Sequence, residues 1–109
     1  MSSEWQSIEA LIELLNSQDV TQFGMAVELL TELGPACVPE LLKGLGHEHR
    51  MVRLGVAAVL SRVGTASPEV IEALRRATND ESEEVREVAA EALRTLMEEQ
   101  DELPEQEAA

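Results

Sequence analysis

The chain has 109 residues and a formal net charge of −14, from 22 acidic side chains against 8 Lys and Arg. A chain of this length forms one domain with a modest core. Its acidic surface repels phosphate backbones and anionic lipids, which argues against nucleic acid and membrane surfaces as partners. No apolar run approaches the roughly 20 residues that cross a bilayer, so we expect a cytoplasmic protein.

The first repeat-like segment contains two helical patterns. Apolar residues at steps of three and four, from Ile8 to Leu15, predict a helix over about residues 4–16. Asp19 is a suitable N-cap for a second helix over about 20–33. Gly34 is placed to cap the end of that helix, because glycine adopts positive φ without steric cost.

The second segment repeats this arrangement. A helix is expected over about 36–45, with Pro39 tolerated near its first turn. His47-Glu48-His49 forms a polar turn, and a helix over about 50–63 follows it. Cys37, the only cysteine, excludes an intramolecular disulfide, and we expect a buried structural thiol because no histidine is placed to act as its base.

The third segment is the clearest copy of the pattern. Ser67 and Pro68 begin a helix of about 68–78. Residues 79–81 turn the chain into a last helix of about 83–98. The remaining residues, 99–109, carry high charge and little to bury, which predicts a disordered acidic tail.

These segments, at about 4–34, 35–64 and 65–98, align as three repeats of one domain, residues 1–98. Leu30, Leu60 and Leu93 coincide, and Arg53 matches Arg86. The charge is uneven along the chain: residues 1–34 hold six acids and no Lys or Arg, 35–79 four acids and six bases, and 80–109 twelve acids and two bases.

The second and third repeats resemble HEAT-like repeats of the short bacterial type, also found in phycobilisome-lyase-related proteins. The matching residues are Val38-Pro39-Glu40-Leu41-Leu42, Val52-Arg53, Ala57, Leu60, Asp80, Val85-Arg86, Ala89, Ala90 and Leu93. The resemblance implies an all-α solenoid, armadillo/HEAT-like, of three antiparallel helix pairs. In such repeats an Asp of the turn pairs with an Arg of the second helix, which implies a structural pair of Asp80 and Arg86. His47 stands at that Asp position in the second repeat, and Phe23 stands at the Arg position in the first.

The second helices differ from one another at three equivalent positions. The third repeat has Glu84, Glu87 and Glu91 there, the first has Thr21, Gly24 and Glu28, and the second has Met51, Leu54 and Ala58. In HEAT-like stacks the second helices line the concave side. Bordered by Arg50 and Arg62, the second-repeat residues would then form an apolar and basic groove between acidic rims, and such a patch marks a binding site. Alternatively, Met51 and Leu54 are part of the core.

No motif for catalysis or for cofactor binding is present. Residues 47–49 offer at most a partial set of metal ligands, so we expect no metal site, no cofactor and no enzymatic activity. We expect instead a scaffold or adaptor that binds another protein or a peptide on the concave second-helix face around repeat two, with the partner's cations meeting Glu84, Glu87 and Glu91.

Several alternatives stay open. The chain could be a regulatory or assembly factor that acts through its acidic tail, or an accessory subunit of a chromophore-lyase-type enzyme. A homodimer could also form through the ends of the solenoid, through Trp5, Ile8 and Ile12 at one end or Val88, Leu96 and Met97 at the other.

Overall fold

The computed structural model describes the backbone of residues 3–64 and 67–108, and the side-chain environments of residues 8–64 and 67–98. This part of the chain is helical and contains no strand. In chain order the elements are α1 (Ser3–Leu14), α2 (Val20–Leu33), the 3₁₀ helix η1 (Gly34–Cys37), α3 (Val38–Gly44), α4 (Arg50–Val63), α5 (Pro68–Ala77) and α6 (Glu83–Ala108).

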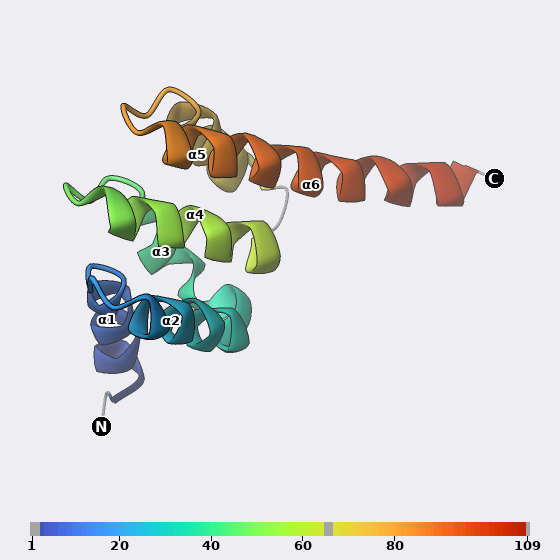
Figure 1. Ribbon diagram of the computed structural model, residues 1–109. Helices are drawn as coiled ribbons and strands as arrows, with labels where there is room; N and C mark the ends of the chain where they lie inside the picture. The colour runs from blue at the N-terminus through green and yellow to red at the C-terminus, as the bar shows by residue number, and fades with distance from the viewer. Residues whose placement is uncertain (1–2, 65–66, 109) are drawn as a thin grey trace.

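The helices form three pairs that stack on one another. Helices α2, α4 and α6 lie side by side in one layer, with α4 in the middle, and α3 and α5 lie behind α4 and α6 (Figure 1). Each first helix packs on the second helix of its own pair, and α4 contacts both α2 and α6. The all-α solenoid expected from the sequence is therefore confirmed, with α1 and α6 at its opposite ends.

Local capping explains the boundaries of α2. The carboxylate of Asp19 accepts a hydrogen bond from the Thr21 N–H at 2.8 Å, which satisfies one free donor of the first turn. Gly34 ends the helix with a φ of 73°, and it is the one positive-φ residue in the part of the chain that the structure describes. A side chain with a Cβ would be strained there.

The helix predicted over 36–45 is divided into η1 and α3. Pro39 has no N–H and cannot donate to the carbonyl of Pro35, as a continuous α-helix would require. The Val38 N–H donates to the Pro35 carbonyl instead, which gives a 3₁₀ turn before α3 begins.

The end of α6 differs from the sequence prediction. A disordered tail was predicted for residues 99–109, whereas the structure continues α6 to Ala108. Most residues of this segment are Glu, Gln, Leu and Ala, which are good helix formers, although Pro104 lies inside it and is unfavourable in a helix interior. Ala109 lies outside the described residues.

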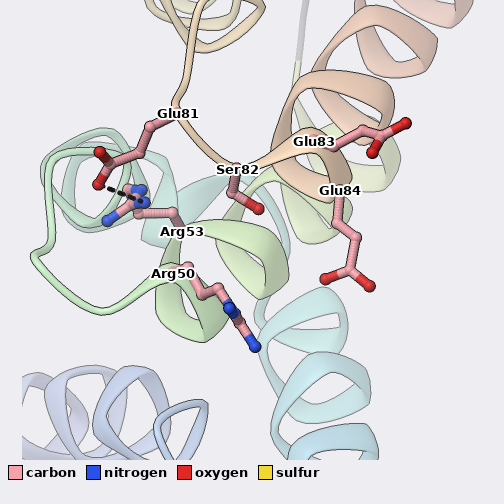
Figure 2. A pocket seen from close by; sticks show the side chains of 6 residues that line it. All are labelled: Arg50, Arg53, Glu81, Ser82, Glu83 and Glu84. Carbon is pink, nitrogen blue, oxygen red and sulfur yellow. Dashed lines mark ion pairs between the residues drawn. The ribbon is translucent and has the colours of Figure 1, made fainter.

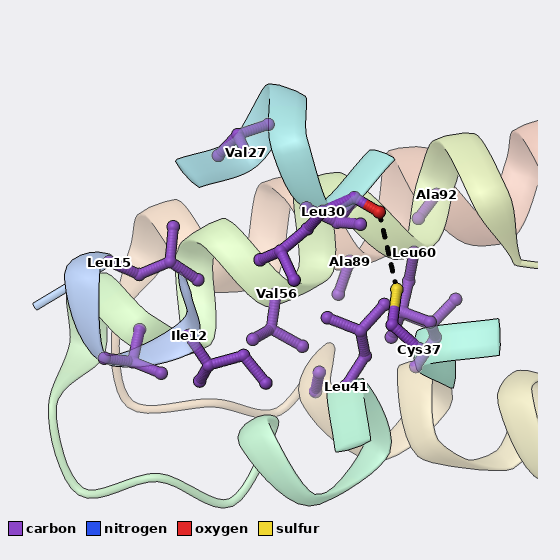
Figure 3. Packing of buried hydrophobic residues seen from close by; sticks show 14 of the residues in the cluster. Ile12, Leu15, Val27, Leu30, Cys37, Leu41, Val56, Leu60, Ala89 and Ala92 are labelled. Atoms are coloured by element: carbon purple, nitrogen blue, oxygen red, sulfur yellow. Dashed lines mark hydrogen bonds between the residues drawn. The ribbon is translucent and has the colours of Figure 1, made fainter. Parts of the chain in front are cut away.

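Helix α4 occupies the centre of the hydrophobic core. Seven of its residues are buried: Val52, Arg53, Gly55, Val56, Ala57, Val59 and Leu60. The surrounding helices contribute fully buried leucines, among them Leu15, Leu30 and Leu41 (Figure 3). A Cβ atom on Gly55 would lie 2.6 Å from Cδ2 of Leu15, so a larger residue there would force the Leu15 side chain, just after α1, to move.

Cys37 is fully buried in this core, as predicted. Its thiol donates to the carbonyl oxygen of Leu30, at 3.4 Å (Figure 3), and to that of Gly34, at 3.1 Å. Burial raises the pKa of the Cys37 thiol above its ordinary value, although a backbone hydrogen bond partly opposes the shift. The thiol is therefore a packing group held in its neutral form.

Candidate functional site

The junction between the second and third repeats is held by Arg53 and Asp80. Nε of Arg53 donates to Oδ2 of Asp80 at 2.8 Å, and Nη2 donates to Oδ1 at 3.1 Å. The family resemblance implied a structural pair of Asp80 and Arg86, but the carboxylate of Asp80 binds Arg53 instead. Arg86 donates to the backbone carbonyl of Asp80, at 2.9 Å, and not to its carboxylate.

Arg53 and Arg86 nevertheless make equivalent hydrogen bonds within their own repeats. Nη1 of Arg53 donates to the carbonyls of His47 and Glu48, at 2.7 and 3.0 Å. Nη1 of Arg86 donates to the equivalent carbonyls of Asp80 and Glu81, at 2.9 and 3.4 Å. Each arginine thus fixes the turn that precedes its helix, and only Arg53 also binds the next repeat.

The ion pair perturbs the acidity of Asp80. Partial burial would raise the pKa of this carboxyl, but hydrogen bonds from Arg53 and from the Ser82 N–H, together with the charges of Arg53 and Arg86, outweigh burial and lower it. The carboxylate is therefore ionised at neutral pH, and the pair is bidentate and charge-assisted.

The three turns share one further hydrogen bond. Side-chain atoms of Ser17, His47 and Asp80 each accept from the backbone N–H two residues later, at 3.0, 3.1 and 2.8 Å. The alignment of the repeats is therefore correct at this position, although the three side chains differ. Only Asp80 brings a charge that can pair with an arginine of the preceding repeat.

The predicted binding residues of α4 lie along one side of that helix. Arg50 and Arg62 are exposed, whereas Met51, Leu54 and Ala58 are half-buried. Leu54 also packs against the hydrophobic core. Leu54 is therefore anchored in the core, and all three side chains keep part of their apolar surface open to solvent.

The predicted acidic rim is exposed on the neighbouring helix. Glu84, Glu87 and Glu91 of α6 are all open to solvent, and Glu28 of α2 is exposed on the other flank. Helix α4, with its half-buried apolar side chains, lies between α2 and α6, the two helices that carry these exposed acids (Figure 1). We call this surface the second-helix face.

Two hollows flank the first turn of α4. One of about 540 Å³ is lined by Arg50, Arg53 and residues 81–84 (Figure 2). The other, of about 480 Å³, is lined by Asn16, Ser17, Gln18, Val20, Phe23, Arg50 and Met51. Arg50 lines both, and it has no ion pair among the residues whose side chains the structure describes.

Sequence reasoning missed the contribution of α2 to this face. Phe23 and the exposed Val20 add apolar surface beside Met51. The sequence indicated this contribution only through Phe23, an aromatic residue at the position that holds Arg53 and Arg86 in the other two repeats.

The part of the chain with described side chains holds no group of three or more His, Cys, Asp or Glu residues arranged to bind a metal ion. His47 is half-buried, with Nε2 at 3.7 Å from Oε2 of Glu13. Across the described helices, none is both long and apolar enough to cross a membrane.

Three stacked helix pairs with an Arg–Asp link between repeats make up this chain. A family model of HEAT repeats matches residues 8–94. The chain belongs to the HEAT-repeat family. The matched range includes residues of all three helix pairs, so the divergent first repeat belongs to the family as well. No curated protein matches the chain. HEAT repeats are commonly protein-interaction modules and are generally not enzymes.

Proposed function

We propose that this HEAT-repeat chain is a non-enzymatic scaffold or adaptor that binds a peptide or protein surface on the second-helix face. The binding residues are Arg50, Met51, Leu54, Ala58 and Arg62 of α4, together with Glu84, Glu87 and Glu91 of α6. One observation carries the proposal: the apolar side chains of α4 are only half-buried, and exposed acids flank them.

Both parts of this surface favour the same kind of partner. Burying an apolar side chain fully contributes about 1.5–3 kcal/mol. A few aliphatic residues of a partner that pack on Met51, Leu54 and Ala58 would therefore strengthen binding. Exposed acids attract cations and accelerate association. The partner that fits best is an amphipathic segment with one aliphatic stripe and flanking lysines or arginines.

The non-enzymatic part of the proposal has its own support. The one thiol, Cys37, is buried in the core and held neutral, and nucleophilic chemistry requires an accessible thiolate. The hollow between α4 and α6 is lined by charged groups that already serve the repeat junction, such as Arg53.

The test uses a labelled amphipathic Leu/Lys peptide of about 15 residues, long enough for four helical turns, and measures its binding by fluorescence anisotropy. We expect Leu54→Glu to weaken binding by roughly tenfold or more, because a charge would be desolvated in the contact. Ala58→Glu is a second variant, in case Leu54→Glu disturbs the core. Ala36→Glu is the matched control, since Ala36 is exposed on η1 and away from the second-helix face.

Circular dichroism separates loss of binding from loss of fold. If folded Leu54→Glu and Ala58→Glu variants bind the peptide as tightly as the Ala36→Glu control, the second-helix face is not the binding surface.

A further inference from the structure

The second helix of each repeat has a side that meets the next repeat, which we call the trailing face. In α2 it includes Val27 and Leu30, and in α4 it includes Arg53, Ala57 and Leu60; all five are buried. The equivalent residues of α6 are Arg86, Ala90 and Leu93. Arg86 and Ala90 are exposed and Leu93 is only half-buried, so among the described residues no further repeat packs on the trailing face of the third.

The opposite side of each second helix meets the preceding repeat, and we call it the leading face. Val59 of α4 and Ala92 of α6 are fully buried there, whereas the equivalent Leu29 of α2 is 40% exposed. Met25 and Leu33 of α2 are exposed as well. Leu29 and Leu33 also line a hollow of about 480 Å³ with Ala10, Leu11 and Glu32. The first repeat therefore presents an apolar leading face to solvent.

These two open faces are related to each other by the repeat. A trailing face packs against a leading face twice within the chain, between α2 and α4 and between α4 and α6. The leading face of the first repeat and the trailing face of the third are the two that are left without such a partner in the described structure, and they lie at opposite ends of the stack (Figure 1).

Both ends of the stack are acidic overall, since residues 80–109 hold twelve acids and two bases, but the trailing face of the third repeat carries a cation. Arg86 has no carboxylate partner among the residues with described side chains, whereas Arg53 at the equivalent position binds Asp80. Arg75 of α5 is a second exposed cation of the third repeat. Residues 1–34 hold six acids and no Lys or Arg, and Glu28 and Glu32 are exposed on α2 beside Leu29.

We infer that the trailing face of the third repeat, Arg86, Ala90, Leu93 and Met97, binds the leading face of the first repeat in a second copy of this chain. The contact imitates an internal repeat junction. This contact does not require an Asp in the turn of the second copy's first repeat. Within one chain, the first and second repeats already pack together with Phe23 and His47 at the positions of Arg and Asp.

The sequence-based hypothesis for a dimer through the solenoid ends named other residues. Ile12 and Leu96 are buried in the core and are not free for a contact, whereas Ile8 and Val88 are half-buried. Met97, which is 44% exposed, does belong to the trailing face. The side chain of Trp5 lies outside the described residues.

A contact between two different faces leaves one of each face free on the resulting pair, so further copies add in a row. The net charge of −14 on each copy opposes this growth. We therefore expect weak association that becomes stronger as salt screens the long-range repulsion, since the Debye length is about 10 Å at 0.1 M.

Sedimentation equilibrium of the full chain tests this contact. The wild type should show a mass that rises with concentration up to about 1 mM, which detects dissociation constants in the millimolar range. Leu29→Glu blocks the leading face and Ala90→Glu blocks the trailing face; both positions are exposed, so folding should persist. Met25→Glu replaces Leu29→Glu if circular dichroism shows that the latter is unfolded.

Mixing the variants gives the decisive result. Each variant alone should be a monomer. Their equimolar mixture should form a dimer and no larger species, because the Leu29→Glu chain keeps an open trailing face and the Ala90→Glu chain keeps an open leading face. The control Ala36→Glu, with the same change in charge, should associate as the wild type does. A wild type that stays monomeric at all concentrations, or either blocked variant that dimerises alone, would overturn the inference.

Discussion

The guanidinium of Arg53 binds the carboxylate of Asp80, 27 residues later in the chain, through Nε–Oδ2 and Nη2–Oδ1 contacts of 2.8 and 3.1 Å. The same guanidinium donates to the carbonyls of its own turn, His47 and Glu48. One side chain therefore connects two successive turns, and the side chains of Arg53 and Asp80 are only 9% and 11% exposed.

Removing the carboxylate should destabilise the fold strongly. Asp80→Ala leaves the Arg53 charge buried without its partner, and breaking such a pair costs about 3–5 kcal/mol when burial is complete. We expect Asp80→Ala to lower the free energy of unfolding, measured in urea, by roughly 2–4 kcal/mol. Glu81→Ala is the matched control, because Glu81 is exposed and lies 3.9 Å from Arg53; it should cost less than about 0.5 kcal/mol. Equal losses for both variants would contradict this role of Asp80.

The contribution of Asp80 should disappear in acid. Its pKa is lower in the folded chain than the unfolded value of about 3.9. The stabilisation is therefore fully present above the unfolded pKa and is lost as the pH falls through the folded pKa. The difference in free energy of unfolding between wild type and Asp80→Asn should be constant above about pH 5 and shrink below about pH 4. A difference that does not change with pH would argue against the ion pair.

Cys37 should resist alkylation in the folded protein. Its thiol is fully buried and its raised pKa disfavours the thiolate, which is the reactive form. Iodoacetamide labelling followed by mass spectrometry should be slow without denaturant and fast in urea. Rapid labelling of the native chain would show that the thiol is accessible.

The sequence predicted features whose causes are local. The observed bounds of α2 and α4, Val20–Leu33 and Arg50–Val63, agree with the predicted ranges of 20–33 and 50–63. In α2 the cause is clear, since Asp19 and Gly34 cap the helix from within a few residues.

The partner of Asp80 could not be predicted in this way. Arg86 is six residues away and at a suitable spacing, but the choice between Arg53 and Arg86 depends on how the third repeat is placed against α4. The half-burial of Leu54 likewise depends on how the neighbouring helices pack around α4, which one sequence does not specify. Composition indicated disorder for residues 99–109, whereas the structure continues α6 to Ala108.

Deleting residues 99–109 should have little effect on stability. The hydrophobic core of the described residues extends from Ile12 to Leu96, so we expect a change of less than about 0.5 kcal/mol in the free energy of unfolding. Binding of the Leu/Lys peptide should also persist. If binding is lost while the fold is kept, the acidic tail is the interaction site, as in the alternative of a regulatory or assembly factor.

If the acids beside α4 belong to a binding surface, two triple variants with the same net charge should differ in their affinity for the peptide. One replaces Glu84, Glu87 and Glu91 with Gln, and the other replaces Glu9, Glu69 and Glu72, which are exposed on α1 and α5. We predict that the first weakens binding of the Leu/Lys peptide by roughly tenfold and the second by no more than about twofold. Equal losses in both variants would show that only the overall charge attracts the peptide, and would contradict the account.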